Sequence, residues 1–71
     1  MSRIVSVYAV FADADEAQRI ARTAVEERLA ACVNVLGTCQ SVYRWQSKVE
    51  IATEAAAIFK ARADKADALV A

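Results

Sequence analysis

The chain opens with an extended pattern in which nearly every position is apolar. Residues 3–11 read as a strand rich in β-formers. One face carries Val5, Val7, Ala9 and Phe11, and the other carries Ile4, Ser6, Tyr8 and Val10. Neither face is strongly polar, which is typical of a strand buried on both sides. We therefore expect this strand to be central in its sheet, with a covering layer on each face, of which helices can supply only one.

An acidic segment follows and predicts the start of a helix. Asp13 stands three residues before Glu16, which is the spacing of a capping box, and acidic groups are favoured at the positive end of a helix dipole. Capping accounts for these carboxylates without a metal ion. Apolar residues then recur at helical spacing, at Ala17, Ile20, Ala21, Ala24, Val25 and Leu29. We expect this helix to lay one apolar stripe on the sheet.

Two further extended segments predict a long β-hairpin. The pattern is extended from residue 32 to residue 45, with a bend or bulge at Gly37, and residues 46–47 read as a two-residue turn. Pairing across that turn sets three pairs on one side: Tyr43 with Glu50, Trp45 with Lys48, and Cys39 with Glu54. The other side carries Val42, Val49 and Ile51, and the second arm is expected to continue to about residue 60.

Residues 64–71 have helical composition, so the predicted order of elements is β-α-β-β-α. That order makes an α/β (α+β) fold of the ferredoxin-like, split βαβ type that lacks its final strand. We expect a single domain over residues 1–71 that is incomplete at its C-terminus. The sheet order of such a unit is 4-1-3-2, so one edge of the first strand is expected to be unpaired.

The composition limits the classes of partner. Hydrophobic residues make up 58% of the 71 residues, above the roughly 45–50% of ordinary soluble domains, and we expect part of this excess to meet another subunit. Nine basic and nine acidic residues cancel, which argues against nucleic acid and anionic membrane as partners. The chain starts without a signal peptide and has no apolar stretch of membrane-spanning length. The sequence predicts a cytoplasmic protein.

The chain contains no histidine, which excludes Ser-His and Cys-His dyads and ordinary zinc sites within it. We therefore expect no enzyme, no required cofactor, and two reduced thiols. Cys32 follows the helix, where a thiol could bind a soft metal ion such as Cu(I); the alternative is a small buried hydrophobic residue. In an unbroken strand Cys32 and Cys39 would face opposite sides about 23 Å apart, too far to share one ion.

The hairpin carries a second candidate site. Tyr43 and Trp45 could form a platform on which a ligand stacks, or they could pack against another subunit. Glu50 and Glu54 lie on the same strand face about 13 Å apart, too far to share a proton. We expect them, with Lys48, to contact a ligand or a neighbouring subunit.

Residues 29–35 (LAACVNV) and 41–50 (SVYRWQSKVE), together with Glu54 and Lys60, resemble the CutA family over essentially the whole chain. The resemblance implies a ferredoxin-like subunit in a tight homotrimer whose sheets face inward, similar to the PII proteins. It also implies a non-enzymatic role in divalent-cation tolerance and in the response to metal ions, with binding of copper or another divalent cation. The alternative is a PII-like sensor that binds a small molecule between subunits.

Several positions depart from the family pattern. Ser47 replaces the usual turn glycine, and Ala12 replaces a proline before the helix. Some relatives have a cysteine associated with copper at the position of Ala9, so the resemblance carries no copper ligand onto that residue. A third reading, a thiol enzyme acting through Cys32, lacks a Cys-x-x-Cys motif and a neighbouring base.

Overall fold

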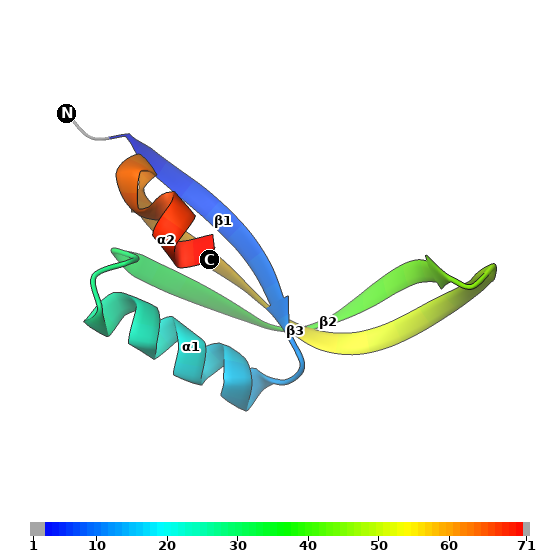
Figure 1. Cartoon of the computed structure of the whole chain (residues 1–71). Helices are drawn as coiled ribbons and strands as arrows, with labels where there is room; N and C mark the ends of the chain where they lie inside the picture. Colours follow the sequence, from blue (N-terminus) through cyan, green and yellow to red (C-terminus); the bar gives the residue numbers. More distant parts are fainter. Residues whose placement is uncertain (1–2, 71) are drawn as a thin grey trace.

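Three antiparallel strands and two helices make up the fold, seen here in a computed structural model that describes residues 3–70 (Figure 1). The predicted mixed α/β class and the predicted order of elements are confirmed. The elements are β1 (Ile4–Phe11), α1 (Ala14–Glu26), β2 (Cys32–Trp45), β3 (Lys48–Arg62), the 3₁₀ turn η1 (Ala63–Lys65) and α2 (Ala66–Val70).

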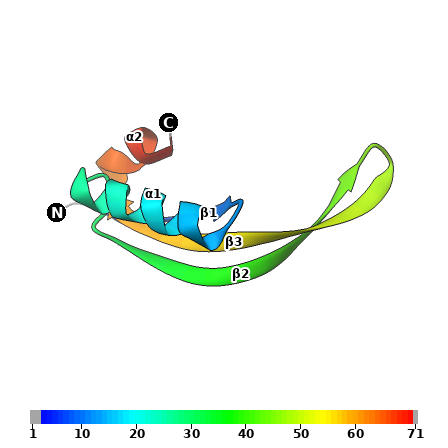
Figure 2. The ribbon, with the colours of Figure 1, turned by 90° about the horizontal axis from the view of Figure 1, so that it is seen from below.

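Strand β3 occupies the centre of the sheet, whose order is β1-β3-β2. The predicted relative order 1-3-2 and the predicted unpaired edge of the first strand are confirmed, because β1 pairs only with β3, from Ile4 opposite Arg62 to Phe11 opposite Ala55. Among residues 3–70, β1 is therefore an edge strand and not the central one. Both helices lie on one side of the sheet (Figure 2). The side of β1 that carries Tyr8 and Val10 is exposed, which confirms that the helices cover only one of its two faces; no element among residues 3–70 covers the other.

Helix α1 begins and ends with recognisable caps. The carboxylate of Asp13 accepts a hydrogen bond of 2.8 Å from the backbone N–H of Glu16, which confirms the predicted cap. At the other end, the N–H of Leu29 donates to the carbonyl of Ala24 and the N–H of Arg28 donates to that of Val25. These are the two bonds of a Schellman motif, and they end the helix at Glu26, before the last residue of the predicted apolar stripe.

The core lies between α1 and the inner half of the sheet and is made largely of small side chains. Ala24, Ala30, Ala57 and Phe59 form its buried cluster, and the rings of Phe11 and Phe59 pack at 6.1 Å between centroids. Alanines on facing elements let the helix approach the sheet closely. Phe59 is the largest side chain of the buried cluster, and partly buried apolar residues such as Phe11 and Ile20 pack around it.

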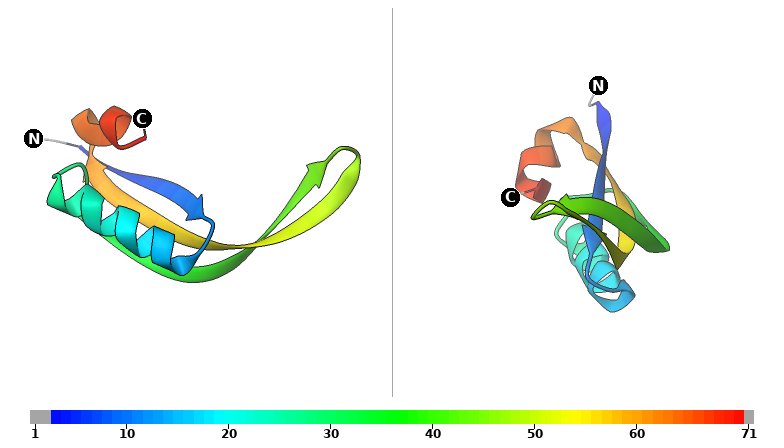
Figure 3. Two further views of the ribbon diagram at one scale, coloured as in Figure 1. Left: turned by 60° about the horizontal axis from the view of Figure 1, so that its bottom comes forward. Right: turned by 90° about the vertical axis from the view of Figure 1, so that its right-hand side faces the viewer.

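Beyond the core, β2 and β3 continue as a two-stranded hairpin arm, which we define as residues 39–54 (Figure 3). A bulge between Val35 and Gly37 separates the arm from the inner half of β2. The predicted two-residue turn is confirmed, with positive φ at Gln46 (51°) and Ser47 (67°). The arm lengthens the molecule to 45 Å, and the radius of gyration is 13.7 Å, against about 11 Å for a compact domain of this size.

Candidate functional site

The uncovered side of the sheet, which we call the open face, is apolar along β1. It consists of Ile4, Ser6, Tyr8 and Val10 of β1 together with the residues of β3 that pair with them. Ile4 and Tyr8 are 63% and 62% exposed, far more than a central strand allows. Alternation along β1 fixes this outcome, since every residue that faces away from the helices faces away from the core. The open face is therefore a surface without a partner inside the described chain.

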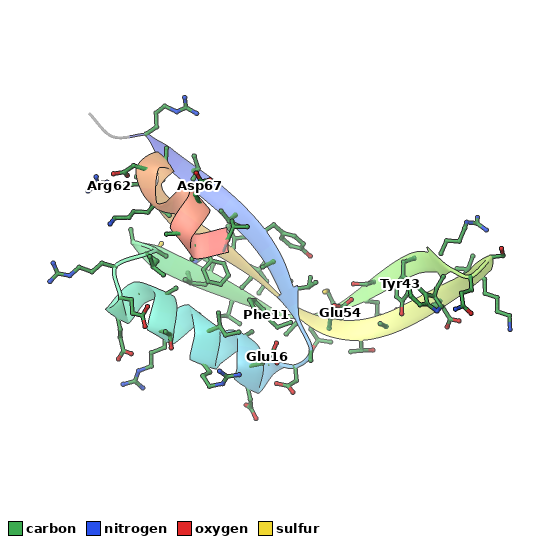
Figure 4. The ribbon with its side chains drawn as sticks, in the orientation of Figure 1. Phe11, Glu16, Tyr43, Glu54, Arg62 and Asp67 are labelled. Carbon is green, nitrogen blue, oxygen red and sulfur yellow. The ribbon has the colours of Figure 1, made fainter. Side chains whose placement is uncertain are left out.

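The hairpin arm brings the predicted site residues together on one side. Tyr43 pairs with Glu50, Trp45 with Lys48 and Cys39 with Glu54, so the predicted register is confirmed at all three positions. Figure 4 labels Tyr43 and Glu54 on this arm. A two-residue turn leaves no freedom in the pairing of the strands it joins, which is why the sequence sufficed. The role of these five residues, Tyr43, Trp45, Lys48, Glu50 and Glu54, in a ligand site or an interface stays a prediction.

Both sides of the arm present side chains that lack partners within the chain. Trp45 is 61% exposed on one side, and Ile51 is 65% exposed on the other, where Val42 and Val49 are exposed as well. Within residues 3–70 the ion pairs are Arg22 with Glu26 and Arg62 with Asp64. Neither involves a carboxylate of the arm, which leaves Glu50 and Glu54 available to another molecule.

The two cysteines are free thiols, and both stand on the open side of the sheet. Cys32 pairs with Lys60 and Cys39 with Glu54, an even number of residues apart on β3. The expectation that they face opposite sides is wrong, because the bulge adds one residue to β2 and reverses the alternation beyond it. Their separation along β3 is still about 20 Å.

The exposure of Cys32 excludes the second of its two interpretations, a metal ligand and a buried hydrophobic residue. Cys32 is exposed, so the alternative of a buried hydrophobic residue is wrong for the described structure. Residues 3–70 contain no group of three or more histidine, cysteine or acidic side chains placed to hold a metal ion. Cys32 could therefore contribute one ligand, and further ligands would have to come from another molecule.

Sequence analysis missed a polar group at the junction of the open face and the arm. Local desolvation, followed by the nearby thiol of Cys39 and carboxylate of Glu54, raises the pKa of the Tyr8 phenol. The three residues come from all three strands, and two of them are cross-strand partners. The Cys39–Glu54 pairing could be predicted from the sequence, but the approach of Tyr8 depends on the register in which β1 pairs with β3.

The fold and its exposed surfaces define a class: a ferredoxin-like α/β subunit with helices on one side of its sheet and a long β2-β3 hairpin. None of the helices that the structure describes is long and apolar enough to cross a membrane. The predicted cytoplasmic location stays a prediction.

Comparison with known proteins identifies the family within this class. The family "CutA1 divalent ion tolerance protein" matches residues 5–71, so the chain belongs to the CutA1 family. The divalent-cation tolerance protein CutA of Archaeoglobus fulgidus is 42% identical over 59 residues, which are 83% of this chain and 57% of that protein.

Solved structures of the family share the fold. CutA1 from Ehrlichia chaffeensis superposes with a TM-score of 0.92 at 30% identity, covering 99% of this chain and 65% of that one. CutA from Synechococcus elongatus PCC7942 complexed with a Bis-Tris molecule superposes with a TM-score of 0.87 at 34% identity, covering 99% and 64%. The chain therefore spans between about half and two thirds of the length of these relatives.

Proposed function

We propose that this chain is a non-catalytic subunit of a homotrimer that acts in divalent-cation tolerance, with copper among the ions concerned. The observation that carries the proposal is the open face, an apolar sheet surface on a chain whose family is named for divalent ion tolerance. The absence of histidine from the sequence supports the non-catalytic role, since it removes the commonest general base.

Burial of the open face would supply the free energy of assembly. Each large aliphatic or aromatic side chain removed from water contributes roughly 1.5–3 kcal/mol. Ile4, Tyr8 and Val10 lie on a single strand, and the exposed aromatic residues of the hairpin arm, Tyr43 and Trp45, extend the same side of the sheet outward. Three such surfaces facing one another would cover side chains that a lone subunit leaves in water.

Light scattering at micromolar concentration tests the assembly. We expect a mass of three chains for the natural sequence. Tyr8→Asp places a charge on the open face and should shift the mass towards one chain, whereas Gln18→Asp, on the exposed side of α1, should not. A natural sequence that is monomeric at this concentration would contradict the proposed trimer.

The proposed role in copper binding rests on Cys32, an exposed thiol of the soft type that Cu(I) prefers. Titration with Cu(I) under anaerobic conditions, followed by calorimetry, should show binding that Cys32→Ser abolishes. Cys39→Ser is the matched control, because it removes the other thiol and should leave the Cu(I) affinity within twofold. Equal loss in the two variants would place the ion elsewhere.

A second candidate function is a PII-like sensor that binds a small molecule between subunits. The complex of Synechococcus CutA with Bis-Tris favours it, as does the exposed aromatic pair of the arm. A thermal-shift panel of nucleotides and divalent metals distinguishes the two functions, since a ligand at 100 times its Kd stabilises by about 2.7 kcal/mol. Stabilisation by a nucleotide alone would favour the sensor.

A further inference from the structure

A basic pocket lies at the C-terminal end of α1, outside the hairpin arm. Its volume is about 490 Å³, within the range of roughly 300–1,000 Å³ that small-molecule sites occupy. The end of α1 and the loop after it, the last residue of β3 and the 3₁₀ turn η1 all contribute to its wall. The lining combines apolar Val25, Leu29 and Ala30 with the cationic side chains of Arg28, Arg62 and Lys65.

The positive charge of this pocket is only partly compensated. Asp64 holds the guanidinium of Arg62 in place, with 3.0 Å between Nε of Arg62 and Oδ1 of Asp64. Arg28 and Lys65 form no ion pair with any carboxylate among residues 3–70. Three cations against one carboxylate leave the pocket positive, in a chain whose formal net charge is zero.

Arg28 occupies a backbone position that suits glycine. Its φ is 61°, in the left-handed region, because it is the residue that closes the Schellman motif of α1. A cation at a helix C-terminus also complements the helix dipole, but a basic residue one turn earlier would do so with an ordinary backbone. Strained backbone conformations cluster at sites of binding and catalysis, and here the residue with the strained backbone lines a pocket.

We propose that this pocket binds a small organic anion, with a phosphate or carboxylate group held by Arg28, Arg62 and Lys65 and a compact apolar body against Val25, Leu29 and Ala30. Arginine suits such a ligand because its planar fork of donors matches the oxygens of both groups. The apolar wall distinguishes the ligand from inorganic phosphate, which would gain nothing from it. Cys32 does not line this pocket, so the site does not depend on the copper ligand proposed above.

The test is an NMR titration of the whole chain with phenyl phosphate as the probe, and with benzyl alcohol, a neutral aromatic analogue, and inorganic phosphate as stand-ins for its two halves. We expect phenyl phosphate to shift the amides of residues 28–31 and 62–65, and each half to bind at least tenfold more weakly. No shift at millimolar phenyl phosphate would overturn the proposal, as would equal binding of benzyl alcohol.

Two variants with the same change in charge distinguish a specific anion site from general electrostatic attraction of the probe to the protein. Arg28→Gly should weaken phenyl phosphate at least tenfold without lowering the melting temperature, because glycine adopts φ of 61° freely. Arg19→Gln removes one positive charge from the exposed side of α1 and should change the affinity less than twofold. An equal loss in both variants, or amide shifts that follow protein concentration instead of probe concentration, would show that no anion site exists.

Discussion

Phe59 and Ile51 lie eight residues apart on the same side of β3, yet Phe59 is 3% exposed and Ile51 is 65% exposed. The backbone around them is alike, since both stand in the same strand and pair with the same neighbour, β2. They differ in what covers them. Helix α1 and the two flanking strands enclose Phe59, while the hairpin arm runs out beyond the helices (Figure 3).

The comparison separates two sources of order. The inner half of the sheet is held by burial of apolar side chains, whereas the arm is held within the chain by strand pairing and its turn. A two-stranded hairpin alone is at best marginally stable in water, so the arm depends on the inner sheet from which it extends. Its apolar side chains stabilise the protein only where another molecule covers them.

The sharpest test truncates both residues. Phe59→Ala should cost about 3–5 kcal/mol in the free energy of unfolding, because it leaves a cavity in a core built otherwise of small residues. Ile51→Ala should cost under about 1 kcal/mol in the monomer, since its side chain is already in water. Urea titration under conditions that keep the chain monomeric measures both. Equal costs would mean that the arm is covered within the chain.

For association between subunits, we expect Ile51 to matter more than Phe59. Ile51→Asp should weaken association by roughly 1.5–3 kcal/mol per subunit if the arm packs on another copy, with no loss of strand content. Sedimentation equilibrium gives the association constant, and Gln18→Asp provides a control of the same charge outside the arm. An unchanged constant for Ile51→Asp would restrict the interface to the open face.

The turn of the arm offers a gain in stability. Ser47→Gly should stabilise the hairpin by about 1 kcal/mol, because φ of 67° is strained for serine and free for glycine. Hydrogen exchange at the amides of Trp45 and Lys48 reports the local effect. Ser41→Gly, within β2 and away from the turn, should destabilise instead. A loss of stability in Ser47→Gly would show that the turn is not the strained element.

The smallest expected effect concerns pH. The hydrogen bond from the Arg62 guanidinium holds the pKa of the Asp64 carboxyl below its ordinary value. A lowered pKa in the folded state contributes stability above the unfolded pKa, and this contribution is lost as the pH falls through the folded value. Both side chains are exposed, so the effect is small. NMR titration should find the Asp64 pKa raised in Arg62→Gln and unchanged in Arg22→Gln.

Most of the fold could be predicted from local sequence. The cap at Asp13 and the register of the hairpin follow from the side chain of one residue and the length of one turn. The positions of the cysteines could not be predicted by counting, since one bulged residue reverses the side on which Cys39 stands. The sequence also could not identify what covers the second side of β1, because an apolar strand has the same pattern whether that side meets the same chain or another molecule.

The clusters of side chains could be identified only from the three-dimensional structure. Arg28 and Arg62 lie far apart in the sequence and meet because β3 returns alongside the end of α1. The left-handed backbone of Arg28 carries no sequence signal, since arginine gives no reason to expect it. Tyr8 lies near Cys39 and Glu54 only because of the register in which β1 pairs with the central strand.

The bulge before Gly37 also lets the two halves of β2 alternate independently of each other, so each half keeps its own choice of which residues stand on the helix side of the sheet. Deletion of Leu36 would join them in one alternation, so either Val33 and Val35 would leave the core or the arm would exchange its aromatic side for its aliphatic side. With the bulge in place, each half can accumulate substitutions against its own surroundings. A conformation that only glycine adopts readily, φ of 96° with open space around it, thus lets the arm diversify without loss of the core.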